Sequence, residues 1–171
     1  ELPNFMTKIN FLGYILKEKN EFNRVIVFCR SKEVADNISK YLGRKIVGEN
    51  NIRVIHANKG QNTRINSMEA FKEGNIQVLV ATDVAARGID IEEVSHVINF
   101  DVPLIYEDYV HRIGRTGRAE KTGVAIVGMG TVGTGVARLL LDHGDRTSRH
   151  AGRILWLEKA VVHDLKKPRS I

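Results

Sequence analysis

The chain has 171 residues, 43% of them hydrophobic and 27% charged, a composition typical of one globular domain rather than a disordered segment. Its formal net charge of +6 favours anionic partners such as nucleic acid or nucleotide phosphate, although a merely solvated basic surface has the same charge. No apolar run approaches the roughly 20 residues that a membrane span needs. The single cysteine, Cys29, cannot form an internal disulfide, which favours the reducing cytoplasm.

Stretches of helical periodicity alternate along the chain with apolar runs rich in Val and Ile. In chain order they predict a helix over 6–19, a strand over 24–29, a helix over 31–42, a strand over 52–57, a helix over 62–74, strands over 77–82 and 96–100, a helix over 106–115, a strand over 123–128, a helix over 134–144 and a strand over 153–162. Most of these strands are continuously apolar, as strands covered by helices on both faces are. We therefore expect an α/β fold with a parallel sheet in three layers.

Two residues mark predicted helix ends. Ser31 precedes the periodic stretch over 31–42 as an N-cap, and Gly74 ends the stretch over 62–74 as a C-cap.

Three polar clusters are expected at the strand ends, where open α/β sheets place their ligands: "CRS" (29–31) after the first strand, "ATDVAARGID" (81–90) after the third strand, and "HRIGRTGR" (111–118) in and after a helix. Thr82 offers a hydroxyl to a phosphate oxygen, and Gly88 allows the chain to approach a ligand closely. Asp90 can accept a hydrogen bond from a ribose hydroxyl. Arg112, Arg115 and Arg118 place three guanidiniums within seven residues, where an anion would relieve their repulsion. The alternative is a solvated basic surface.

The successive motifs "VIVFCRS", "QNTR", "VLVATDVAARGID", "VINFDVP" and "YVHRIGRTGR" resemble those of the second RecA-like lobe of DEAD-box RNA helicases, over about residues 1–126. The resemblance implies a RecA-like lobe of the P-loop NTPase type. It also implies roles for single residues. Arg115 and Arg118 match the arginine fingers that reach the γ-phosphate of ATP on another lobe, His111 matches a residue that couples the lobes, and Asp90 lies near the ATP ribose. Arg30, Gln61, Arg64, Thr82 and Gly88 match positions along the RNA backbone.

The sequence has no Gly-x-x-x-x-Gly-Lys-Ser/Thr loop and no Asp-Glu-Ala-Asp stretch. Because an arginine finger stabilises a transition state that is assembled elsewhere, we expect no ATP hydrolysis or RNA unwinding by this lobe alone. ATP would be a ligand only together with a partner lobe. No histidine pair has metal-ligand spacing, so no metal site is predicted.

A second pattern begins inside the strand over 123–128. Gly128, Gly130 and Gly133 fit Gly-x-Gly-x-x-Gly between a predicted strand and a predicted helix, which is the context of a dinucleotide site. Residues Gly128, Gly130, Thr131, Val132 and Gly133 would then face the pyrophosphate of NAD or NADP. Residues 124–171 resemble the N-terminal cofactor-binding part of homoserine dehydrogenases. The chain lacks that family's catalytic region, so dehydrogenase activity is not expected.

These two resemblances predict a RecA-like lobe over 1–123 and a Rossmann-type β-α-β fragment over 124–171, continuing one sheet. A join within a strand favours an engineered chimera without complete enzymatic activity. The alternatives are a module that retains weak RNA binding and an NAD(P)-binding module. We expect a monomer, unless the strand over 153–162 pairs between chains as an exposed edge and gives a dimer.

Overall fold

The computed structural model describes residues 4–18, 22–86, 94–103, 105–115 and 124–126. Their elements in chain order are α1 (Phe5–Glu18), β1 (Val25–Cys29), α2 (Lys32–Leu42), the π-helical turn η1 (Gly43–Val47), the 3-10 turn η2 (Glu49–Asn51), β2 (Ile52–Ile55), α3 (Gln61–Lys72), β3 (Val78–Thr82), α4 (Asp83–Ala86), β4 (His96–Asn99), α5 (Tyr106–Ile113) and β5 (Val124–Ile126).

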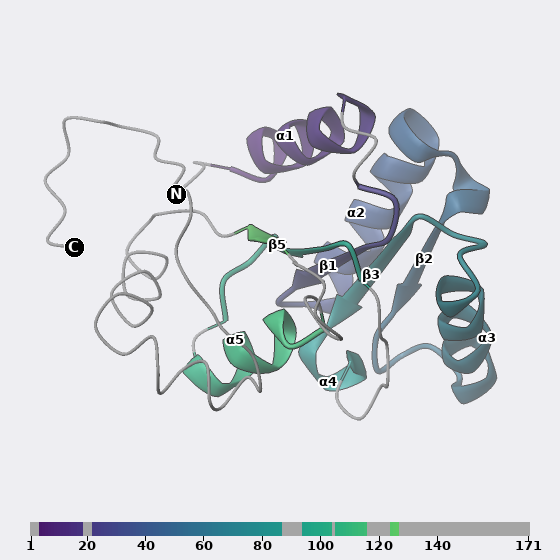
Figure 1. Ribbon diagram of the computed structural model, residues 1–171, viewed down its shortest axis with the longest axis vertical. Coiled ribbons are helices and arrows are strands. Elements are labelled where there is room, and N and C mark those ends of the chain that lie inside the picture. Colours follow the sequence, from purple (N-terminus) through teal and green to yellow (C-terminus); the bar gives the residue numbers. More distant parts are fainter. Residues whose placement is uncertain (1–3, 19–21, 87–93, 104, 116–123, 127–171) are drawn as a thin grey trace, which may run out of the picture.

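The five strands form one parallel sheet in the order β2-β3-β1-β4-β5 (Figure 1). The central strand β1 places Cys29 opposite Thr82 of β3 and Phe28 opposite Asn99 of β4. In a parallel sheet all strands end at the same edge, so the residues that follow β1, β2, β3 and β4 are brought together. The expected parallel α/β sheet is confirmed.

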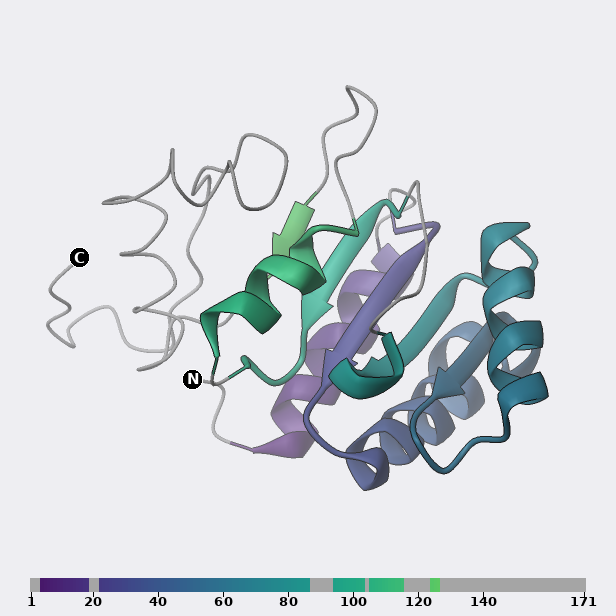
Figure 2. The same ribbon diagram turned by 90° about the horizontal axis from the view of Figure 1, so that it is seen from below.

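Helices cover both faces of this sheet, and the alternation of side chains along β1 explains the division. Val25, Val27 and Cys29 belong to one apolar cluster with residues of α1 and α2. Ile26 and Phe28 point to the other face and pack with residues of α3 and α4. In Figure 2, α1 lies behind the sheet, whereas α4 and α5 lie in front of it. The described residues therefore form the three layers that the apolar strands predict.

Both predicted helix ends are present. The Ser31 hydroxyl accepts a hydrogen bond from the Val34 amide and caps α2. Gly74 lies one residue beyond the C-cap of α3, in the left-handed region with φ of 77°. The Gly74 amide donates to the Phe71 carbonyl and the Asn75 amide to the Ala70 carbonyl, which is the Schellman arrangement.

Some local structure differs from the prediction. No pattern in the sequence predicts η1, η2 or α4, and β2 ends at Ile55 instead of continuing to residue 57. A strand is confirmed at Val124–Ile126, where β5 pairs with β4. The predicted helix over 134–144 and the predicted strand over 153–162 lie outside the described residues. The division into 1–123 and 124–171 stays a prediction.

Candidate functional site

The residues that follow the parallel strands form what we call the carboxyl edge: Arg30 after β1, His56 after β2, Thr82 and Asp83 around the end of β3, and Asn99 to Asp101 at the end of β4. Each predicted site residue that the structure describes lies at this edge, on α3 or α5, or, for Arg115, directly after α5.

Of the RNA-binding residues predicted from the helicase resemblance, the four that the structure describes lie at this edge or in the first turn of α3 beside it. Arg30 and Thr82 are neighbours across β1 and β3, because Cys29 pairs with Thr82. Thr82 is largely buried, and Arg30 is exposed. Arg64 reaches the same place from α3, since its Nη2 donates to the carbonyl oxygen of Ala85 in α4 at 3.3 Å. Its Nη1 donates to Oε1 of exposed Gln61 at 3.3 Å, so these two side chains point the same way from the first turn of α3.

Arg112 of α5 occupies the centre of the carboxyl edge and is only 2% exposed. Its Nε and Nη2 donate to the two oxygens of the Asp83 carboxylate at 2.6 and 2.7 Å. Its Nη1 donates to Oδ1 of Asn99 at 3.0 Å and to the carbonyl oxygen of Asp101 at 2.5 Å. The guanidinium also lies 5.2 Å from the centre of the Phe28 ring, a cation–π contact. Arg112 of α5 therefore contacts β1, α4 and the end of β4.

This geometry corrects the interpretation of Arg112 as one of three anion-binding arginines. A carboxylate of the chain itself, Asp83, neutralises Arg112, and burial excludes an external phosphate. Arg115 follows α5 and is partly buried, with its amide donating to the Arg112 carbonyl. His111 lies on α5 and is exposed.

Asp101 connects the two sides of the carboxyl edge. Its Oδ2 accepts the backbone amide of Arg30 at 3.1 Å, and its Oδ1 is 3.3 Å from Nζ of Lys8 in α1. The Asp101 carbonyl oxygen also accepts a hydrogen bond from Arg112 of α5. Asp101 thus fixes the backbone of Arg30 relative to α5.

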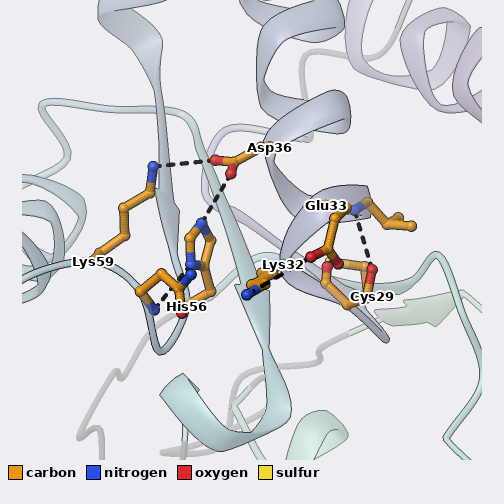
Figure 3. A network of polar contacts seen from close by, with 9 residues as sticks. Cys29, Lys32, Glu33, Asp36, His56 and Lys59 are labelled. Atoms are coloured by element: carbon orange, nitrogen blue, oxygen red, sulfur yellow. Dashed lines mark hydrogen bonds and ion pairs between the residues drawn. The ribbon is translucent and has the colours of Figure 1, made fainter.

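A second polar cluster lies where β2 leads into α3. Nε2 of His56 is 3.2 Å from Oδ2 of Asp36, and Nζ of Lys59 is 3.1 Å from Oδ1 of the same carboxylate (Figure 3). Partial burial raises the pKa of Asp36, but hydrogen bonds from Lys59 and His56 and their charges outweigh this effect and hold the pKa below its ordinary value.

Cys29 lies buried at the end of β1 beside the same edge. Burial above all, with the nearby Asp101 carboxylate next in effect, raises the pKa of the thiol to about 12. The thiol donates weakly to the carbonyl oxygens of Ser31 and Ala81, so it behaves as a packed apolar group.

Sequence reasoning did not assign a role to Asp83, Asn99 or Asp101, nor to the pair of Asp36 and His56. A signal was present for the first three, because each is a polar residue at the end of a buried strand. No signal could show that Asp36 and His56, 20 residues apart, meet in space. The predicted site residues outside the described part of the chain are Gly88, Asp90, Arg118, Gly128, Gly130, Thr131, Val132 and Gly133.

Within the described ranges, no group of three or more His, Cys, Asp or Glu side chains could hold a metal ion. None of the helices described there has the length and apolarity of a membrane span.

The fold and the carboxyl edge define the class of protein: a helicase C-terminal domain, since the family "Helicase conserved C-terminal domain" matches residues 7–120. The chain is 46% identical over 158 residues to DEAD-box ATP-dependent RNA helicase 5 of Arabidopsis thaliana, covering 90% of this chain and 28% of the relative. It also resembles the E. coli DEAD-box protein SrmB, whose structure was solved bound to regulator of ribonuclease activity A. The TM-score is 0.66 and the sequence identity 36%, and the match covers 96% of this chain and 88% of the other chain. S. cerevisiae Dbp5 L327V, solved bound to RNA and ADP BeF3, matches with a TM-score of 0.67 and 27% identity over 96% of this chain and 40% of the other.

The chain belongs to the DEAD-box RNA helicases, as a C-terminal helicase domain with a RecA-like fold. It spans between 11% and 28% of the length of the curated relatives compared with it. The three proteins named above give no support to the resemblance to homoserine dehydrogenases.

Proposed function

We propose that the chain is the C-terminal lobe of an ATP-dependent RNA helicase and that its carboxyl edge binds the RNA backbone. The observation that carries this proposal is the hydrogen bond from Arg64 to the Ala85 carbonyl, because it brings α3 to the strand ends where Arg30 and Thr82 lie. The solved relative bound to RNA and ADP BeF3 supports it. Contacts to phosphate and sugar carry no sequence information, so binding through the backbone would be insensitive to RNA sequence.

We extend the proposal to ATP on the basis of the family. His111, Arg115 and Arg118 would act on ATP held by a partner lobe, with Asp90 near the ribose and Gly88 near the RNA. Arg112 contributes indirectly, since its bonds to Asp83 and Asp101 fix α5, which leads into Arg115. Without the partner lobe we expect no hydrolysis. The single buried cysteine supports the cytoplasm as the compartment.

Fluorescence anisotropy with a labelled single-stranded oligouridylate tests the RNA proposal. Arg64→Ala should weaken binding roughly tenfold, the size expected for loss of a charged hydrogen bond, and lower the slope of log K against log salt by about one. Arg44→Ala is the matched control, because Arg44 is exposed on η1 beside Glu49, away from the edge. Equal effects of the two substitutions would show that net charge alone binds RNA and would refute the proposed site.

The glycine pattern supports a second candidate function, dinucleotide binding. β5 is a parallel strand that ends two residues before Gly128, which is where a dinucleotide motif requires a strand. On this proposal the segment 124–171 would be a dehydrogenase-like fragment and the chain a chimera. A fluorescence titration with NADPH and NADH should then saturate, and Gly130→Val should abolish the signal. A linear, unsaturated titration would leave the chain with the helicase function alone.

A further inference from the structure

The turn between β2 and α3 is held by a small polar cluster that we call the turn clamp: Asp36, His56 and Lys59 (Figure 3). His56 is 3% exposed, whereas the Asp36 side chain, reaching from α2, is 38% exposed. One oxygen of the Asp36 carboxylate contacts Nε2 of His56, and the other contacts Nζ of Lys59. One side chain of α2 therefore holds two residues of the turn.

Both ring nitrogens of His56 have a partner. The Asn58 amide donates to Nδ1 of His56 at 3.3 Å. Nε2 lies 3.2 Å from Oδ2 of Asp36. The Lys59 amide donates to the His56 carbonyl at 3.0 Å. The backbone from residue 56 to residue 59 is thus folded around an imidazole whose outer nitrogen is anchored on α2.

The clamp ends where α3 begins. Gly60 is the N-cap residue of α3, and it has no side chain to accept a hydrogen bond from the first turn. Gln61 and Arg64 lie in that first turn, with the Arg64 amide donating to the Gly60 carbonyl at 3.1 Å. Since no side-chain cap fixes the start of the helix, the folded turn before it sets the position of Gln61 and Arg64.

We propose that His56, anchored by Asp36, is a positioning residue for RNA binding, which places Gln61 and Arg64 against the RNA backbone without touching it. This inference rests on the proposed RNA-binding function of the carboxyl edge. It assigns to two residues of this chain a role that acts only through α3.

Electrostatics and positioning predict opposite effects of removing Asp36. Asp36 is an anion, and its pKa below the ordinary value keeps it charged at neutral pH. If charge alone mattered, removing this carboxylate would strengthen the binding of polyanionic RNA. If Asp36 positions α3, its removal weakens binding although the chain becomes more positive.

The first experiment therefore compares Asp36→Ala with Glu33→Ala in the 171-residue chain, by anisotropy with labelled oligouridylate at two salt concentrations. Glu33 is the matched control, because it is an exposed carboxylate on the same helix whose ion-pair partner is its neighbour Lys32. We expect Asp36→Ala to weaken binding roughly threefold or more and Glu33→Ala to leave it unchanged or slightly tighter. Equal or tighter binding by both variants would overturn the inference.

The second experiment separates packing from hydrogen bonding at His56. His56→Leu fills the space without the bonds, whereas the oxygen of His56→Asn can still accept the Asn58 amide. We expect Asn to recover affinity that Leu loses, at similar urea stability. In an Arg64→Ala background His56→Leu should weaken binding less than it does in the unchanged chain, because part of its effect passes through Arg64. Full additivity of the two losses would overturn the positioning role.

The two proposals fail in different ways. If Arg64→Ala binds RNA as the unchanged chain does, the proposed RNA site is wrong and so is the clamp's role. If Arg64→Ala weakens binding while Asp36→Ala and His56→Leu do not, the RNA site stands and the positioning inference alone is wrong.

Discussion

Arg112 shows how a residue within an arginine-rich motif can be structural. Its guanidinium and the Asp83 carboxylate form a bidentate ion pair that is largely shielded from water. Nη1 of Arg112 donates to Asn99 and to the Asp101 carbonyl oxygen. Such a buried pair adds little net stability compared with an apolar replacement, but breaking it leaves a charge without its partner. The Asp83 side chain is 24% exposed, so the isolated carboxylate would be partly desolvated.

We predict that Arg112→Ala lowers the free energy of unfolding by about 3 kcal/mol, the size typical of a broken buried pair. Arg112→Lys should lose less, because it keeps the charge but not the planar fork. Urea unfolding followed by circular dichroism measures both. Arg44→Ala, at an exposed arginine, should change stability by no more than about 0.5 kcal/mol. A loss from Arg112→Ala as small as that of the control would contradict the structural role.

Cys29 leads to a prediction about reactivity. Its thiol is buried and its pKa is raised to about 12, chiefly by burial, so almost no thiolate exists at pH 8. Iodoacetamide should leave the native chain unmodified at that pH and should alkylate it fully in denaturing urea. Mass spectrometry over time distinguishes the two states. Modification of the native chain at the rate of a free thiol would show that the end of β1 opens readily.

At this scale the sequence indicated residue types and their place, but not their partners. Cys29 ends an apolar run of the sequence, and its side chain is buried as that place indicates. Arg112 was grouped with Arg115 because they are close in sequence, whereas its actual partner Asp83 is 29 residues away. Local spacing does not contain that information.

Among the elements, the ends of helices are determined by short-range hydrogen bonds and can therefore be predicted from the sequence. Ser31 caps α2 and Gly74 ends α3, as the sequence predicts, because both depend on bonds between residues no more than five positions apart. η1 and α4 depend on packing against other parts of the chain and were not predicted. β2 stops before His56 because the imidazole takes the Asn58 amide and folds the backbone away from the strand.

Gly74→Ala tests the C-terminal end of α3. No atom lies within 4 Å of the position a Cβ would take, so the cost comes from the left-handed backbone at φ of 77° alone. We expect a loss of about 1 kcal/mol in the free energy of unfolding. Gly60→Ala is the control, since its φ of −57° suits any residue and its Cβ also meets open space. Its effect should stay within about 0.5 kcal/mol. Equal effects would mean that the left-handed turn at Gly74 is not formed.

In the whole molecule, the parallel sheet gathers distant parts of the chain at one edge. The continuous apolar runs of β1 and β3 favour this arrangement, since the strands of parallel sheets are covered by helices on both faces and are apolar throughout. Two polar clusters, one around Arg112 and one around Asp36, then connect helices to that edge. The side chains proposed to bind RNA thus depend on bonds made elsewhere in the fold, and one partner in these bonds, Asp36, has a lowered pKa.

Acidification should reveal the contribution of Asp36 to the stability of the whole chain. Its folded-state pKa lies below the ordinary value, because bonds from Lys59 and His56 outweigh the effect of burial. A lowered pKa means that the stabilisation is complete above the unfolded-state pKa of 3.8 and is lost as the pH falls through the folded value. We expect the difference in unfolding free energy between the unchanged chain and Asp36→Asn to be constant from about pH 5 to 7 and to shrink below about pH 4. Lys59→Met should move this loss to higher pH, since it removes one of the two bonds that lower the pKa. A difference that does not vary with pH would mean that the ion pair in Figure 3 does not form in solution.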